Sequence, residues 1–116
     1  MSIVDFKTLA PEVHHYLPAD ERIIQGTPNQ SVAEYYQSPC SQFQCGRWSG
    51  EVGQWRVVYT EHEYCEILKG VSVITEEGGA SKTVQAGDRF VIPAGFIGTW
   101  EVIEPCEKIY VMFEAK

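Results

Sequence analysis

The most constraining feature of this 116-residue sequence is the regular spacing of its short apolar runs and turn signals. From Val32 onward, runs rich in β-branched and aromatic residues alternate with turns at intervals of about 8–12 residues. Ten glycines and six prolines are spread between these runs and are not gathered in one linker. This pattern is typical of a sandwich or closed barrel. The sequence therefore predicts an all-β fold, and its length is enough for one compact domain.

The first thirty residues differ from the rest. Pro11, Pro18 and Pro28 interrupt any long helix there, and the segment has no clear hydrophobic period. We therefore predict an N-terminal arm over residues 1–30 and a barrel domain over residues 31–116. Strands are predicted near residues 22–25, 42–48, 54–60, 63–68, 71–75, 82–85, 89–92, 99–103 and 108–113.

The charge balance and the length of the apolar runs limit the kinds of partner that we expect this protein to bind. Nine basic and sixteen acidic residues give a formal net charge of −7, which repels the phosphate backbone of a nucleic acid. No apolar run approaches the ~20 residues that cross a bilayer. Asp5 and Lys7 interrupt the stretch where a signal peptide needs an apolar region. We expect a cytoplasmic protein with a small-molecule ligand, without nucleic-acid or membrane partners.

The four cysteines form no Cys-x-x-Cys pair, and no histidine follows them at zinc-finger spacing. In a reducing compartment such cysteines stay as thiols. We predict four reduced thiols, most of them buried: Cys40, Cys45, Cys65 and Cys106.

Residues 57–68 carry polar groups on both faces of the expected strands. A barrel interior that tolerates polar groups explains the mixed character of the first face. With a period of two, this face carries Val57, Tyr59, Glu61, Glu63, Cys65 and Ile67. The other face carries Val58, Thr60, His62, Tyr64, Glu66 and Leu68.

Two short motifs in the same region resemble those of the cupin superfamily. Cupin motif 1 ends in Glu-x6-Gly, which Glu63 and Gly70 match in spacing. Cupin motif 2 reads G-x5-P-x-G-x2-H-x3-N, and Gly87, Pro93 and Gly95 match its glycines and proline. The resemblance covers about residues 43–113 and implies a single jelly-roll barrel of the RmlC-like type.

Further matches narrow the resemblance within the cupins. Gly46-Arg47-Trp48, Gly53-Gln54-Trp55 and the stretch from Gly98 to Tyr110 are similar to small single-domain cupins grouped with the ureidoglycine aminohydrolase cupin domain. The resemblance implies a homodimer, and a Lys and a Tyr on the last strand. These positions are Lys108 and Tyr110.

The metal ligands of cupins are largely missing. The motif 1 histidines fall at Val57 and Tyr59 with one permitted spacing, or at Arg56 and Val58 with the other. The motif 2 histidine falls at Gly98. Glu63 alone remains, and a divalent ion needs three or four donors. We therefore expect no metal and no other cofactor.

Three histidines lie elsewhere in the sequence. His14 and His15 are adjacent, so in a strand their side chains face opposite ways, and His62 lies on the face opposite Glu63. We expect all three to be solvated or interface residues.

Glu63 and Lys108 are the candidate catalytic residues, and Tyr59, Cys65, Trp100 and Tyr110 the candidate ligand-binding residues. Two interpretations of the charged pair stay open: a buried ion pair that only balances its own charges, or an acid/base with a cation that holds the substrate. The aromatic side chains, with Trp48 and Trp55, are either core or the wall of a pocket. Cys65 is a weaker nucleophile candidate because no histidine shares its face.

These residues support two functions of different classes. The first is a binding protein that holds a small polar metabolite, nitrogenous or carboxylate, without a transition metal. The alternative is a metal-independent hydrolase or isomerase that acts on a ureide-, amine- or sugar-like substrate, with Glu63 as acid/base. Whether the chain is an enzyme stays open at this point.

Overall fold

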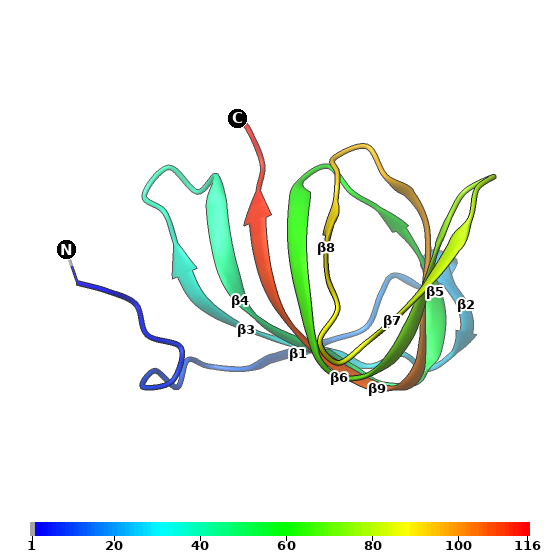
Figure 1. The fold of residues 1–116 in the computed structure, drawn as a ribbon, viewed down its shortest axis with the longest axis horizontal. Coiled ribbons are helices and arrows are strands. Elements are labelled where there is room, and N and C mark those ends of the chain that lie inside the picture. The colour runs from blue at the N-terminus through cyan, green and yellow to red at the C-terminus, as the bar shows by residue number, and fades with distance from the viewer. Residues whose placement is uncertain (1) are drawn as a thin grey trace.

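The computed structural model describes residues 2–116 and confirms the all-β prediction. Apart from one 3-10 turn, every regular element in these residues is a strand, and the sheet curls around on itself (Figure 1). The elements are β1 (His14–Tyr16), η1 (Asp20–Arg22), β2 (Ile23–Gly26), β3 (Gln30–Gln37), β4 (Phe43–Gly50), β5 (Gly53–Val58), β6 (His62–Glu76), β7 (Ser81–Gln85), β8 (Arg89–Ile92) and β9 (Ile97–Phe113). Within the described residues, no helix is long and apolar enough to span a bilayer.

Two long antiparallel strands, β6 and β9, form the spine of the barrel. β9 pairs with β6 along most of its length, while its two halves pair with β5 and β4 on the other side. The register between β6 and β9 shifts around Lys69 and Val71, where the strands bend. Gly70 has a φ of +86° there, and a Cβ on it would lie 2.1 Å from the Pro105 carbonyl oxygen. Gly70 and Pro105 therefore lie where β6 and β9 bend, and neither strand ends there.

This bend corrects part of the strand prediction. The segments predicted at 63–68 and 71–75 are both within β6, and those at 99–103 and 108–113 are both within β9. No strand is predicted at β3, although seven of its eight residues pair with β4. A register shift between Glu34 and Tyr36 breaks its alternation of buried and exposed residues, so the strand has no clean period of two.

The segment predicted as an arm contributes two short strands to the sheet. β1 pairs with β3, and β2, close to the strand predicted at 22–25, pairs with β5. Figure 1 shows the chain running along the barrel before it enters β1. This path brings residues 16–30 against the interior of the barrel.

The predicted division of faces over residues 57–68 is confirmed. Glu63, Cys65 and Ile67 are buried, whereas His62 and Leu68 on the other face are exposed. The buried core is built around indole, thiol and branched aliphatic side chains: Trp48, Trp55, Cys65, Ile67, Ile74, Val84, Ile92, Trp100, Val102, Cys106 and Tyr110.

All four cysteines are reduced, as predicted. The expectation that most are buried is wrong, because only Cys65 and Cys106 are buried. Cys45 is half-buried, and Cys40 is exposed in the β3–β4 connection.

Candidate functional site

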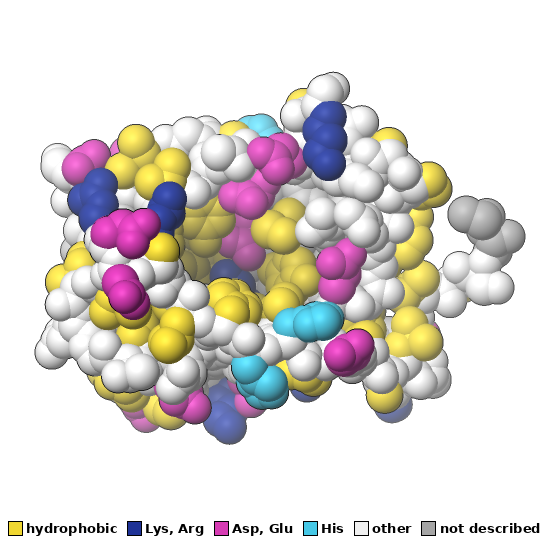
Figure 2. Space-filling model, turned by 180° about the vertical axis from the view of Figure 1, so that it is seen from behind, with side chains coloured by type: hydrophobic (Ala, Val, Ile, Leu, Met, Phe, Trp, Pro, Cys, Tyr) yellow, Lys and Arg dark blue, Asp and Glu magenta, His cyan; other side chains and the backbone are white. Residues whose placement is uncertain are grey.

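An open cavity of about 490 Å3 occupies the interior of the barrel. Figure 2 shows it as a hollow lined mainly by hydrophobic side chains, with both acidic and basic side chains inside it. Its aromatic lining consists of Tyr16, Trp48, Trp55, Tyr59, Trp100 and Tyr110. Its charged lining consists of Arg22, Glu34, Arg56, Glu61, Glu63 and Lys108.

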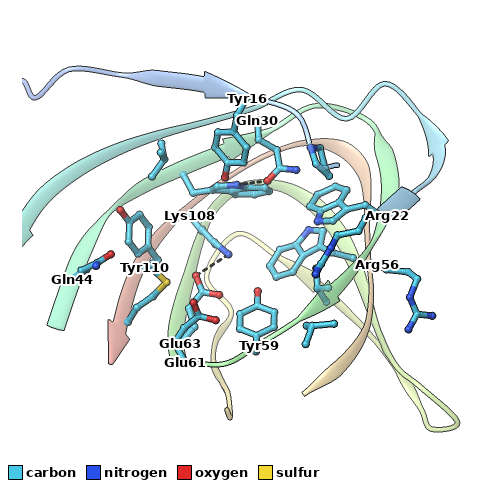
Figure 3. A pocket seen from close by; sticks show the side chains of 18 of the residues that line it. Tyr16, Arg22, Gln30, Gln44, Arg56, Tyr59, Glu61, Glu63, Lys108 and Tyr110 are labelled. Atoms are coloured by element: carbon cyan, nitrogen blue, oxygen red, sulfur yellow. Dashed lines mark hydrogen bonds and ion pairs between the residues drawn. The ribbon is translucent and has the colours of Figure 1, made fainter. Parts of the chain in front are cut away.

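A buried ion pair forms part of the cavity wall. Glu63 lies on β6 and Lys108 on the adjacent β9, and both side chains project to the inside of the barrel. The Lys108 Nζ lies 3.1 Å from the Glu63 Oε2, and each side chain is only 6% exposed (Figure 3). The pairing predicted from the sequence is therefore confirmed. Its two charges balance each other where little solvent reaches either side chain.

Two tryptophans complete the surroundings of the Lys108 ammonium. Its Nζ lies 4.7 Å from the Trp48 ring centroid and 4.3 Å from that of Trp100, within the range of cation–π attraction. Each indole is oriented by its own hydrogen bond. Trp48 Nε1 donates to Gln30 Oε1 at 2.9 Å, and Trp100 Nε1 donates to Ser72 Oγ at 3.0 Å.

These contacts keep Lys108 charged. Burial alone lowers the pKa of a lysine, but the attraction of the Glu63 carboxylate and its hydrogen bond outweigh burial and raise the pKa of Lys108. Lys108 is therefore an ammonium near neutral pH. It acts as a hydrogen-bond donor and a positive charge, because a nucleophilic lysine needs a lowered pKa.

Tyr59 lines the cavity beside the ion pair. In Figure 3 its hydroxyl points toward Glu63 and Lys108. Burial raises the pKa of Tyr59 well above its ordinary value, and the neighbouring Glu63 carboxylate raises it further. The phenol therefore keeps its proton and serves as a donor toward Glu63 or toward a ligand.

The other predicted site residues are divided between the cavity and the core. Trp100 and Tyr110 line the cavity with Tyr59, and both are also part of the core. Cys65 is fully buried and is not among the lining residues. Burial raises its pKa to about 12, so its sulfur is a neutral thiol packed behind the cavity wall.

Several lining residues were not singled out from the sequence. Tyr16, Pro18, Arg22 and Gln30 come from the N-terminal segment, and Glu34 and Gln44 come from β3 and β4. None belongs to a motif, so no local signal identifies them. Their place in the wall depends on the path of the chain across the barrel.

The histidines lie outside the cavity lining. His14 and His15 are exposed on β1, and His62 is exposed at the start of β6. His62 Nδ1 accepts a hydrogen bond from the Ala94 backbone N–H at 3.1 Å, and its ring stacks on Phe113. This imidazole therefore supports the loop before β9 from the outer face.

The side chains at the expected cupin ligand positions do not fit a divalent metal. Val57, Val58 and Gly98 supply no donor, Arg56 is a cation, Tyr59 keeps its phenol proton, and Glu63 is paired with Lys108. Within residues 2–116, no three side chains of His, Cys, Asp or Glu are arranged to hold an ion together. The donor chemistry needed for a transition metal is thus lacking at this position.

The raised pKa of Cys65 predicts a loss of stability in alkali. The unfolded thiol ionises near its ordinary pKa of 9.0, whereas the folded thiol keeps its proton up to about 12. Above about pH 9 the unfolded state therefore binds fewer protons, and the free energy of unfolding falls by roughly 1 kcal/mol for each pH unit. Urea unfolding near pH 8 and near pH 10 measures this. The Cys65→Ser variant should lose less stability than the wild type over the same interval, and equal losses would contradict the assignment.

Comparison with known proteins agrees with this architecture. No curated protein sequence matches the chain at a significant level. Among solved structures, it is similar to the EutQ protein of Clostridium difficile, with a TM-score of 0.67 and 18% identity over 77% of this chain and 65% of that one. It is also similar to a DUF861 protein of unknown function from Pseudomonas syringae pv. tomato, with a TM-score of 0.79 and 20% identity. That match covers 91% of this chain but only 45% of the other.

A second DUF861 protein, from Thermotoga maritima, is 34% identical over 55% of this chain and 73% of its own, with a TM-score of 0.54. The family model for the EutQ-like cupin domain matches residues 37–110, which is more than half of the chain. This range contains the two cupin motifs, Glu63 and Lys108. The chain therefore belongs to the family of EutQ-like cupin domains.

Proposed function

We propose that this cupin binds a small polar metabolite, nitrogenous or carboxylate, in its barrel without a transition metal. The observation that carries the proposal is the Glu63–Lys108 ion pair, which is buried and yet lies on the wall of an aromatic-lined cavity. A buried ion pair adds little net stability compared with packed apolar residues. A pair that faces a cavity still offers carboxylate lone pairs and ammonium N–H groups to a ligand.

The chemistry of the pair indicates the kind of group it recognises. Glu63 accepts hydrogen bonds and Lys108 donates them, so an amide or ureide, with N–H and C=O side by side, matches both. The indole and phenol rings offer flat surfaces to a planar group. The sequence resemblance to the ureidoglycine aminohydrolase cupin domain supports ureides among the candidate ligands.

A second candidate function is a metal-independent hydrolase or isomerase. It is favoured by Tyr59, whose protonated phenol lies beside the Glu63 carboxylate. In this proposal Glu63 removes or returns a proton on the substrate, Tyr59 donates a hydrogen bond, and Lys108 stabilises negative charge. Turnover followed by NMR separates an enzyme from a binding protein, since only an enzyme changes the spectrum of its ligand.

A thermal-shift screen in excess EDTA tests binding. The compounds are small amides, ureides, amino acids and sugars. We expect at least one to raise the Tm of the chelated protein, because ligands stabilise the state they bind. The Glu63→Gln variant should bind that compound about tenfold more weakly or worse than the wild type, because it loses a charge-assisted hydrogen bond.

Two further variants make the screen decisive. Tyr59→Phe removes a single cavity hydroxyl and covers the case in which Glu63→Gln is poorly folded. Glu107→Gln removes a carboxylate that pairs with Lys69 and Arg47 away from the cavity, and should leave binding unchanged. The proposal fails if no compound shifts the Tm, or if binding is the same in Glu63→Gln and Tyr59→Phe as in the wild type.

A further inference from the structure

The cavity is completed by residues that lie before the family-matched region. That region begins at residue 37, whereas Tyr16, Arg22 and Gln30 also line the cavity. The β1–β3 pairing places Tyr16 opposite Gln30, and Gln30 in turn accepts the hydrogen bond of Trp48. The segment from β1 to β3 therefore forms one wall of the site, and the Gln30–Trp48 hydrogen bond connects it to the rest of the cavity lining.

Arg22 is the distinctive charge on this wall. Of the three cations that line the cavity, Lys108 pairs with Glu63 at 3.1 Å, and Arg56 pairs with Glu77 at 3.6 Å. Among the described residues no carboxylate lies within 4.0 Å of the Arg22 guanidinium. Its five N–H donors are thus available to a ligand.

Acidic and basic side chains also lie on different sides of the cavity. In Figure 3, Glu61 and Glu63 lie to one side of Tyr59, while Arg22 extends from η1 into the other side. One end of the cavity therefore offers carboxylate acceptors beside Lys108, and the other offers a guanidinium. A guanidinium binds a carboxylate through two parallel hydrogen bonds, which adds orientation as well as affinity.

We infer that Arg22 binds a carboxylate group of the ligand, and that the opposite end of the same molecule is an amide, ureide or amine held at Glu61 and Glu63. The ligand class is thus a small amido, ureido or amino acid. This inference rests on the proposed binding function and deepens it. In this inference the N-terminal segment recognises the carboxylate of the ligand, and residues of the barrel bind its nitrogenous end.

Matched pairs of compounds test the inference. Succinamate, hydantoate and N-acetylglycine each carry a carboxylate, and their uncharged partners are succinamide, hydantoamide and N-acetylglycinamide. Calorimetric titration gives the affinity ratio of acid to amide for each pair. In the wild type we expect at least one acid to bind about tenfold tighter than its amide, as an added charge-assisted hydrogen bond provides.

Variants of Arg22 then test whether this side chain causes the preference for acids over amides. In Arg22→Gln the acid-to-amide ratio should fall to near one while amide affinity stays the same, and Arg22→Lys should keep part of the preference. Arg47→Gln is the control, because Arg47 does not line the cavity and pairs with Glu107 at 4.0 Å. It should leave the ratio unchanged.

The outcomes separate this inference from the proposed function. If amides bind as tightly as acids and lose affinity in Glu63→Gln, the role of Arg22 is overturned and the binding function stands. A preference for acids that survives Arg22→Gln also overturns that role. If neither acids nor amides bind the wild type at millimolar concentration, the inference is overturned and the ligand class must be sought among the other compounds of the screen.

Discussion

Lys108→Met is expected to lower the free energy of unfolding by about 3–5 kcal/mol. The substitution keeps an unbranched apolar side chain, one atom shorter than lysine, but leaves the Glu63 carboxylate buried without its counterion, which lies 3.1 Å away in the wild type. It also removes the charge that lies over the Trp48 and Trp100 rings. Urea unfolding at neutral pH, monitored by tryptophan fluorescence and circular dichroism, measures the loss.

The double variant Lys108→Met with Glu63→Gln identifies the cause. Because it removes both charges, it should be more stable than Lys108→Met alone, and the two single effects should not add. Lys69→Met is the matched control, since the Lys69–Glu107 pair lies at the surface, with side chains 66% and 31% exposed, and should contribute less than about 1 kcal/mol. Additive effects of the two cavity substitutions would contradict the ion-pair account.

The second large effect is expected at Gly98, the position where cupins place the motif 2 histidine. An ideal Cβ on Gly98 would lie 2.0 Å from the Thr75 carbonyl oxygen on the neighbouring strand β6. Even Gly98→Ala must therefore displace the backbone of β6 or β9, and we expect it to cost about 3 kcal/mol in the free energy of unfolding. Thermal and urea unfolding both report this loss.

The same contact bears on the missing metal ligand. Gly98→His meets the same backbone oxygen, so it should destabilise the fold and should not bind Zn2+ or Co2+ more tightly than the wild type. Gly79→Ala is the control, because the nearest atom to its Cβ is the Glu76 Cβ at 3.2 Å, so a shift of a few tenths of an ångström accommodates it. If Gly98→Ala were as stable as Gly79→Ala, the close approach of β6 and β9 would be disproved.

Alternation and turn signals were enough to predict the strand class and the inner face of the barrel. Glu63, Cys65 and Ile67 could be assigned to one side because side chains alternate strictly along a strand. The continuity of β6 and β9 could not be predicted, because Gly70 and Pro105 resemble ordinary strand terminators. Only the pairing of the two strands shows that this corner is a bend. β3 was missed because its register shift removes the alternation on which the prediction depends.

The candidate site was predictable to the extent that it lies within the motifs. Glu63 follows from cupin motif 1, and Lys108 could be paired with it because a buried carboxylate requires a counterion. Arg22 and Tyr16 could not be found in this way. Their contribution depends on how residues 14–30 pair with β3 and β5, and such long-range pairing has no local sequence signal.

The most direct test of binding without a metal is a calorimetric titration in excess EDTA. The compound with the largest thermal shift is titrated into wild-type protein and into Glu63→Gln. The account predicts saturable binding of one molecule per chain to the chelated wild type, and affinity about tenfold weaker or worse in Glu63→Gln. Binding that disappears with EDTA and returns with added metal, or equal affinity in the two proteins, would contradict it.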